Sequence, residues 1–364
     1  MKKKNAPNFT LLGTLIVLNL IGIAAIAGAS IPLASRNLGQ PFYFLFRHIF
    51  LGILPGGILA YIAFKTPLKF FKKYSLYIFL FAFFLIILVF VPGIGESIGG
   101  ARRWINLRII NFQPSELFKL SVILYLSAWL TSLDKKQITL HKLIGFLVIT
   151  GVTALIFIFQ PDMSTLGVIL LTSLIIYSTS KAPWRHIVIL ILLGIIFFLV
   201  AVKIAPYRMS RLLIFLNPEK DPLGEGYHIK QAFIAVGSGG ILGKGLGLGQ
   251  QKYGFLPQPI SDSIFANYAE ETGFIGSLIL VILFIILIVE GFRIAKNLQD
   301  EFGRLVAVGI TSWFAIQAFV NIGSMIGLLP LTGIPLPFVS YGCSALIAEF
   351  IGAGILLNLS KMTK

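Results

Sequence analysis

The sequence contains little cysteine, histidine or charge, and each shortage excludes a class of protein. A single cysteine, Cys343, cannot form an internal disulfide or a cysteine-based metal cluster. The four histidines are scattered, with no spacing typical of metal ligands. Charged residues make up only 12% of the 364 residues, which is too few for a soluble protein of this length.

Long apolar runs are what the chain has instead. Hydrophobic residues make up 57% of it, and the mean hydropathy is +0.91. The runs are about 20 residues long, as helices crossing a hydrocarbon core of roughly 30 Å require, and they lack the alternation of an outer-membrane barrel. We therefore predict an all-α polytopic membrane protein, a single domain over residues 1–364. Ten transmembrane helices are expected, at residues 9–34, 41–64, 74–92, 114–132, 141–160, 163–180, 186–205, 263–292, 303–329 and 336–359.

The net charge of +16 reflects basic residues that lie mostly on one side of this layout. In a soluble domain such a charge would suggest nucleic acid, but beside a membrane the anionic partner is expected to be lipid, and no nucleic acid is expected. By the positive-inside rule, the connections rich in lysine and arginine face the cytoplasm. We therefore place both termini in the cytoplasm of a bacterial cell, with the chain in its cytoplasmic membrane. The inward clusters are Lys2–Lys4, residues 65–73, 135–142, 181–185 and 293–304, Lys361 and Lys364.

Two segments on the opposite side are also basic, namely residues 93–113 and 206–261. Either long loops are translocated whatever their charge, or both segments face an anionic ligand. The second segment is a large extracytoplasmic loop between helices 7 and 8, and its apolar stretches argue against disorder. The basic residues of the two segments include Arg102, Arg103, Arg108, Arg208, Arg211, Lys220, Lys230, Lys244 and Lys252.

A few ionisable residues fall within or beside the predicted spans, where they are costly and hence candidates for function. Glu116 and Lys119 stand three apart on one helical face and can form an ion pair, structural or functional. Asp162 follows Pro161 at a short turn and is expected to cap the next helix. Glu349 lies deep in the last span, and the sequence identifies no partner for it.

Asp262 lies where the long outer segment enters the eighth span, after Pro257 and Pro259. Desolvation at this interface can raise the pKa of its carboxyl group toward that of a useful base. The alternative is an ordinary helix cap. Glu270 and Glu271, two turns further on, could form a second charged shell or pair with basic residues.

A glycine-rich string covers residues 237–249 but does not match a nucleotide-binding loop. The Walker pattern needs glycine where Ser238 stands, and serine or threonine where Gly245 follows Lys244. No nucleotide is therefore expected. The string instead predicts a flexible or closely packed backbone.

Several motifs together resemble one family. They are GARRWINL with FQPSELFKL, QPDMST, the run from YRMSRLL to GLGQQK, AEETGFIG after Asp262, and NIGSMIGLLPLTGIPLPFVSYG. These stretches, at residues 100–120, 160–165, 206–276 and 321–346, resemble the SEDS family (shape, elongation, division and sporulation) in order and in ten-helix layout. The resemblance implies an inverting peptidoglycan glycosyltransferase that polymerises lipid II into β-1,4 glycan strands at the outer face of the cytoplasmic membrane. It also implies a class B penicillin-binding protein and other divisome or elongasome proteins as partners.

The resemblance further implies that Asp262 is the catalytic residue. One base suffices, because the undecaprenyl diphosphate leaving group is already stable as an anion, unlike the case of glycoside hydrolysis. Trp104 could stack on a sugar or serve as an interfacial anchor. A divalent cation, Mg²⁺ or Mn²⁺, could assist the basic residues. The substrate-binding candidates are Arg102, Arg103, Trp104, Glu116, Lys119, Arg208, Arg211, Lys244 and Lys252.

The pair Gln251–Lys252 resembles the division branch (FtsW type) more than the elongation branch (RodA type). The chain departs from the family pattern at Gln258 and Ile260, which replace a carboxylate and an imidazole, and no role is assigned to either. It also departs at Ser164, His228 and Cys343.

Two other functions stay open on the sequence. A lipid II flippase would need a charged path through the bundle, for which Arg47 and Glu349 are the candidates. A non-catalytic membrane scaffold of the cell-wall synthesis complex is the second.

Overall fold

The structure, a computed structural model, describes residues 6–98, 101–106, 111–132, 140–204 and 206–363. The side chains of residues 34–38, 98, 101, 140 and 206 are not described, and Lys2–Lys4, Arg108, Lys135, Lys136 and Lys364 of the predicted basic clusters lie outside the described residues. The elements are α1 (Phe9–Leu38), α2 (Tyr43–Arg47), the π-helix η1 (His48–Ile53), α3 (Leu54–Lys65), α4 (Leu68–Leu88), β1 (Gly95–Ile98), β2 (Ala101–Asn106), β3 (Asn111–Phe112), α5 (Pro114–Ser132), α6 (Leu140–Phe159), α7 (Met163–Thr179), α8 (Trp184–Ile204), α9 (Pro206–Leu216), the 3₁₀-helix η2 (Pro218–Lys220), α10 (Glu225–Ser238), α11 (Ile264–Asn297), α12 (Glu301–Met325) and α13 (Cys343–Ser360).

The long helices confirm a helical membrane protein. Eight helical segments of the described chain are long and apolar enough to cross a membrane. Two further predicted spans fall on α7, an apolar helix of 17 residues, and on α5, which carries Glu116 and Lys119. The eight segments are Phe9–Leu33, Tyr43–Lys65, Leu68–Leu88, His141–Phe159, Trp184–Ile204, Ile264–Asn297, Glu301–Met325 and Cys343–Ser360.

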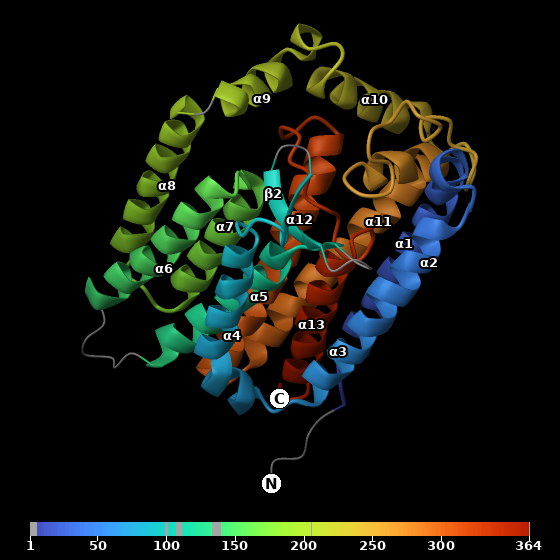
Figure 1. Cartoon of the computed structure of the whole chain (residues 1–364). Coiled ribbons are helices and arrows are strands. Elements are labelled where there is room, and N and C mark those ends of the chain that lie inside the picture. Colours follow the sequence, from blue (N-terminus) through green and yellow to red (C-terminus); the bar gives the residue numbers. More distant parts are fainter. Residues whose placement is uncertain (1–5, 99–100, 107–110, 133–139, 205, 364) are drawn as a thin grey trace.

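α12 lies at the centre of the bundle and packs against α5, α7 and α11 (Figure 1). α13 packs closely along α3, because glycines let the two backbones approach each other. A Cβ on Gly354 would lie 2.3 Å from the carbonyl oxygen of Ala60, so only glycine fits at this contact. α8, by contrast, exposes most of its apolar side chains, as a helix facing lipid does.

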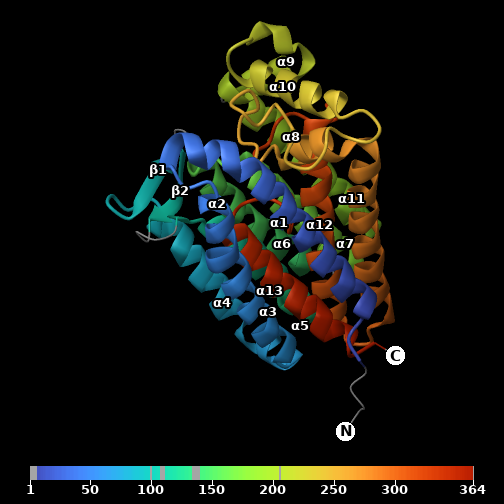
Figure 2. The same cartoon turned by 90° about the vertical axis from the view of Figure 1, so that its right-hand side faces the viewer.

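The two ends of the bundle differ. At one end the start of α1 meets the end of α13, where the backbone N–H of Asn8 donates to Ser360 Oγ at 3.0 Å. At the other end α9, η2 and α10 form an arch over residues 206–238, which Figures 1 and 2 show extending from α8 across to α11. The prediction of an ordered segment here is confirmed, since α10 occupies the apolar stretch that the sequence singled out.

The structure corrects two predictions, the all-α class and the start of the last helix, and it adds a break within α11. Residues 93–113 contain a three-stranded antiparallel sheet of order β1-β2-β3, so the chain is not purely α-helical. The last helix begins at Cys343, because residues 336–342 form an irregular segment despite their apolar character. α11 is broken at Gly273, whose φ of 67° is left-handed, and Phe274 N–H bonds outward to the carbonyl of Gly240.

Candidate active site

Asp262 lies directly before α11, at the end of the loop that follows α10. Ser263 occupies the cap position of α11 and makes no side-chain capping bond, so the alternative of an ordinary helix cap at Asp262 is wrong. The backbone around Asp262 is held at three points. Asn321 Nδ2 donates to the Asp262 carbonyl at 2.9 Å, Ser340 Oγ to the Ser261 carbonyl at 2.8 Å, and the Tyr341 N–H to the Ile260 carbonyl at 2.8 Å.

The environment of Asp262 makes it a base that can work near neutral pH. Burial raises the pKa of its carboxyl group to about 6, and the neighbouring Arg103 guanidinium opposes this increase. Gly333, with φ of 66°, keeps the space beside the carboxylate open, because a Cβ there would lie 3.5 Å from Asp262 Oδ2. Among the described residues we find no hydrogen bond to this carboxylate, which leaves its oxygens available to a ligand.

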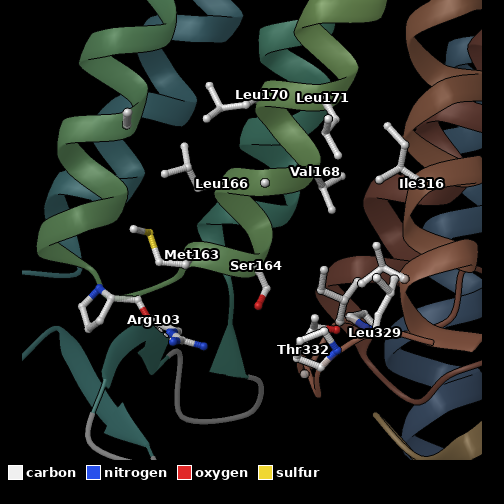
Figure 3. A pocket seen from close by; sticks show the side chains of 18 of the residues that line it. Arg103, Met163, Ser164, Leu166, Val168, Leu170, Leu171, Ile316, Leu329 and Thr332 are labelled. Carbon is white, nitrogen blue, oxygen red and sulfur yellow. Dashed lines mark hydrogen bonds between the residues drawn. The ribbon is translucent and has the colours of Figure 1, made fainter. Parts of the chain in front are cut away.

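A cavity of about 1390 Å³ opens beside Asp262, and it has one polar end and long apolar walls. Its walls come from α6, α7, α8 and α12. Figure 3 shows Arg103 and Ser164 toward one end, while Leu166, Leu170 and Leu171 follow α7 away from them and Ile316 stands opposite on α12. The volume exceeds that of an ordinary small-molecule site, and the division suits a long ligand with a polar head and an apolar tail.

The polar end carries several arginines from separate elements. Arg103, on β2, donates to the carbonyl of Pro161 and lies 3.9 Å from Asp162. Arg208 Nη1, on α9, donates to the Ala201 carbonyl at 2.8 Å, and Arg211 Nε pairs with Glu225 at 2.6 Å. These guanidiniums also line the cavity, so a fork of donors can reach an anionic ligand there.

Arg47, which the sequence suggested only as part of a transport path, also lines the cavity. It ends α2, immediately before the π-helix η1, and its Nη1 donates to Tyr43 Oη at 3.0 Å. Such π-helical turns often lie at functional sites, but hydropathy patterns do not reveal them.

The other predicted residues of the first outer segment and of α5 fall into three places. Trp104, on β2, lines the cavity, whereas Arg102 beside it is exposed and is not part of the lining. Glu116 and Lys119 form the expected ion pair at 2.8 Å, with both side chains 3% exposed. They lie in the core of the bundle and not in the cavity lining.

Lys244 and Lys252 also lie away from the cavity, and each is paired with a carboxylate of α11. Lys244 Nζ lies 2.7 Å from Glu270, and Lys252 Nζ lies 2.6 Å from Glu271 with both side chains almost fully buried. Of the two roles considered for Glu270 and Glu271, pairing with basic residues is the one observed.

The glycine-rich string packs tightly on α11, in line with the closely packed alternative. A Cβ on Gly243, where φ is 82°, would lie 2.2 Å from the Glu271 carbonyl oxygen. The N–H groups of Lys244 and Gly245 donate to the carbonyls of Glu270 and Glu271, which the break at Gly273 leaves accessible. The carboxylates and carbonyls of Glu270 and Glu271 therefore bind the string to α11, the helix that begins beside Asp262.

Other residues that the sequence singled out also have defined places. Asp162 caps α7 through Thr165 N–H at 3.3 Å, as predicted. Gln258 lines the cavity with φ of 49°, and Ile260 is buried. His228 contacts Ser263 Oγ through Nε2 at 2.7 Å, and burial lowers its pKa below the ordinary value.

The site does not have the donor set of a resident metal centre. Within the described ranges, no group of three or more His, Cys, Asp or Glu side chains is arranged to hold a metal ion. We therefore derive no catalytic step from a protein-held cation.

Comparisons with known proteins identify a family and similar folds. The family described as cell cycle protein, which comprises FtsW, RodA and SpoVE, matches residues 9–364. The chain is 38% identical to stage V sporulation protein E of Bacillus subtilis over 366 residues, covering 100% of this chain and 99% of that protein. It is 38% identical to a probable peptidoglycan glycosyltransferase FtsW of Geobacter sulfurreducens over 355 residues, covering 96% and 94%.

Two solved structures are similar in fold over nearly the whole chain. One is from a study of the structural coordination of polymerization and crosslinking by a peptidoglycan synthase complex, with a TM-score of 0.80, 25% identity and 98% of each chain covered. The other is the rod shape determining protein RodA of Thermus thermophilus, with a TM-score of 0.69, 23% identity, and 98% of this chain and 97% of that chain covered.

Proposed function

The chain belongs to the FtsW, RodA and SpoVE family of cell cycle proteins, and on this premise we propose that it is a peptidoglycan glycosyltransferase that polymerises lipid II. One observation carries the proposal. The carboxylate of Asp262, a base with a pKa of about 6, stands at the arginine-lined end of a cavity whose remaining walls are apolar.

Asp262 supplies the base that the reaction needs. The 4-hydroxyl of the acceptor GlcNAc attacks the anomeric carbon of the donor MurNAc, and its proton passes to the Asp262 carboxylate. A new glycosidic C–O bond forms as the bond from the anomeric carbon to the diphosphate oxygen breaks, with inversion at that carbon. The leaving diphosphate departs as an anion and requires no second carboxylic acid.

The arginines of the cavity suit the diphosphate. Arg103, Arg208 and Arg211 approach from β2 and α9, and planar guanidiniums bind phosphate oxygens through paired N–H donors. Arg47 adds a fourth cation from α2. The apolar surfaces of α6, α7 and α8 match the undecaprenyl chain, which keeps the lipid in contact with the bilayer during transfer. Lys244 and Lys252 are not diphosphate ligands in this proposal, because Glu270 and Glu271 neutralise them.

The membrane arrangement in this proposal has ten spanning helices, the eight long apolar segments together with α5 and α7. The arch and the sheet face the outside of the cytoplasmic membrane, with the large loop between the seventh and eighth spans. The two termini then lie in the cytoplasm, in keeping with the contact between Asn8 and Ser360 at the opposite end of the bundle.

Partners and cofactor follow the family. A class B penicillin-binding protein would crosslink the strands made here, as the likeness to a chain of a peptidoglycan synthase complex suggests. Relatives named FtsW favour the division branch over the elongation branch. A Mg²⁺ or Mn²⁺ ion would bind chiefly to the substrate diphosphate, since such ions often use one carboxylate and substrate phosphates.

The test is polymer formation from lipid II by the purified protein and by the Asp262→Asn variant. We expect glycan strands from the wild type, resolved by gel electrophoresis, and none from the variant, because asparagine cannot accept the proton. Glu219→Gln removes an exposed carboxylate from the same outer segment and is expected to leave polymerisation unchanged. Polymer from Asp262→Asn at the wild-type rate would contradict the assignment of the base.

A second assay separates the proposal from its alternatives. Vesicles with labelled lipid II report transport between leaflets, whereas lipid II added from outside reports polymerisation. A protein that moves lipid II but makes no polymer would be a flippase, and one that does neither would be a scaffold.

A further inference from the structure

Glu349 is a buried carboxylate that the proposed mechanism does not use. It lies in α13, 2% exposed, and it does not line the cavity. A carboxylate within a membrane-spanning helix costs several kcal/mol, and such residues therefore tend to have a function.

Both oxygens of Glu349 accept hydrogen bonds, and one of these bonds fixes an unusual piece of backbone. Oε2 accepts the N–H of Phe338 at 2.8 Å, and Oε1 accepts Gln317 Nε2 at 3.1 Å. Phe338 has φ of 62°, the left-handed region that a bulky residue rarely adopts, and its side chain is 1% exposed. The carboxylate thus holds Phe338 where its own conformational preference would not.

Gln317 connects the same backbone segment to the core of the bundle. Its Nε2 also donates to the Pro335 carbonyl at 3.0 Å, so Gln317 and Glu349 hold the segment at Pro335 and Phe338. Its Oε1 accepts from Lys119 Nζ at 2.9 Å and from Trp313 Nε1 at 2.7 Å. These donors orient the amide of Gln317 toward the segment and toward Glu349.

The other side of this segment supports the base. Asn321 Nδ2 bonds to the carbonyls of both Ile334 and Asp262, at 2.8 and 2.9 Å. Ser340 Oγ donates to the Ser261 carbonyl, while the Tyr341 N–H donates to the Ile260 carbonyl. Residues 334–341 therefore connect the Glu349 carboxylate to the backbone that carries Asp262.

We propose that Glu349 is a positioning residue for the transfer reaction: it holds residues 334–341 in the strained form that places Asp262 at the cationic end of the cavity. The inference rests on the proposed glycosyltransferase function. It concerns the placement of the base, because the arginines that would bind the diphosphate lie outside this segment, on α2, β2 and α9.

The proposal predicts a loss of rate without a loss of substrate affinity. In Glu349→Gln, an NH₂ group replaces one of the two carboxylate oxygens, so either the Phe338 N–H or Gln317 Nε2 faces another donor. A base displaced by about 1 Å costs on the order of 100-fold in rate, and we expect kcat to fall about 10- to 100-fold with KM unchanged. Glu349→Met, which accepts neither bond, should be affected at least as much.

Stability should not follow the rate. The buried group contains one cation, Lys119, and two carboxylates, Glu116 and Glu349, of which Glu116 already pairs with Lys119. Replacing Glu349 leaves Lys119 paired with Glu116, so Glu349→Gln, which keeps one of the two hydrogen bonds, should have a Tm close to that of the wild type. Glu349→Met loses both bonds and should unfold at a lower temperature. A purely structural role would lower Tm and kcat together in Glu349→Gln.

The experiment uses the full chain and measures kcat, KM, Tm and the dependence of kcat on pH with lipid II as substrate. Glu290→Gln is the matched control, because Glu290 is also buried and hydrogen-bonded in a long helix but at the far end of α11. In the Glu349 variants, the acid limb of the profile of kcat against pH should move to lower pH, because an Asp262 that is held less firmly is better solvated. The control should keep the wild-type limb.

Four results would overturn the inference. Two concern the rate: a wild-type kcat and a wild-type pH dependence in both Glu349 variants, or a fall in kcat that Glu290→Gln reproduces. Two concern stability: a fall of Tm and kcat together in Glu349→Gln, or variants that fail to fold. If the wild-type protein itself makes no polymer, the proposed function fails instead, so the two failures are distinguishable.

Discussion

The buried pair of Lys252 and Glu271 allows a direct test of whether Lys252 has a structural role or binds substrate. Its Nζ lies 2.6 Å from Glu271 Oε1 and donates to the Gly247 carbonyl at 2.7 Å, with the lysine side chain 0% and the glutamate 1% exposed. Lys252→Met would leave the Glu271 carboxylate buried. Within the part of the chain that the structure describes, its remaining hydrogen-bond donor would be the Gly247 N–H, at 2.9 Å from Oε2.

The expected cost follows from this geometry. Removing one partner of a buried ion pair destabilises a protein by about 3–5 kcal/mol, because the other charge stays desolvated. An unfolding entropy of about 2.1 cal/mol/K per residue over 364 residues converts this to a fall in Tm of about 4–7 °C. Lys252→Met/Glu271→Gln removes both charges and should recover at least about half of the loss.

The assay is thermal unfolding of the purified variants in detergent, together with KM for lipid II. Lys220→Met, which removes an exposed lysine of η2, serves as the control and should change stability by less than about 0.5 kcal/mol. A Lys252→Met protein with a wild-type Tm and a raised KM would refute the reasoning. Lys252 would then be a substrate ligand and not the partner of Glu271.

Three further predictions concern the cavity. Polymerisation by the wild type should decline as pH falls through about 6, because the raised pKa of Asp262 makes it lose its basic form there, and a pH–rate profile measures this. Arg103→Gln removes the guanidinium that lowers the pKa of Asp262, so the acid limb should move to higher pH while KM rises; a limb that stays at the wild-type position would contradict this coupling. Arg211→Ala should raise KM for lipid II by about 10-fold or more, because a charged hydrogen bond to the substrate is lost. Arg102→Ala, at an exposed position outside the cavity lining, should leave KM unchanged. Titrations of rate against lipid II measure both, and equal effects of the two variants would count against the assigned cavity.

Local relationships along the chain were predictable from the sequence. The ion pair of Glu116 and Lys119 follows from a spacing of three on a helix, and the cap at Asp162 follows from its place after Pro161. The helical membrane class follows from the length of the apolar runs. The position of Asp262 beside a basic outer segment also follows from the order of residues, because the two are adjacent in the chain.

Partners far apart in the chain were decided only by the tertiary structure. Lys252 and Lys244 have the same chemistry as the arginines of the cavity, yet α11 presents Glu271 and Glu270 to them. Gln317 meets Lys119 across 198 positions, and Glu349 meets Phe338 only because residues 336–342 leave the helical form that their apolar character suggested.

The physical reason is the range of each interaction. Hydropathy, capping and spacing act within one or two helical turns, so composition and order determine them. A buried charge instead requires whichever polar group the packed bundle brings to it, and that group depends on how the helices cross. The sequence by itself therefore determined a helical membrane protein with a carboxylate beside a basic segment, and packing decided which cations face the cavity and which residues hold that carboxylate.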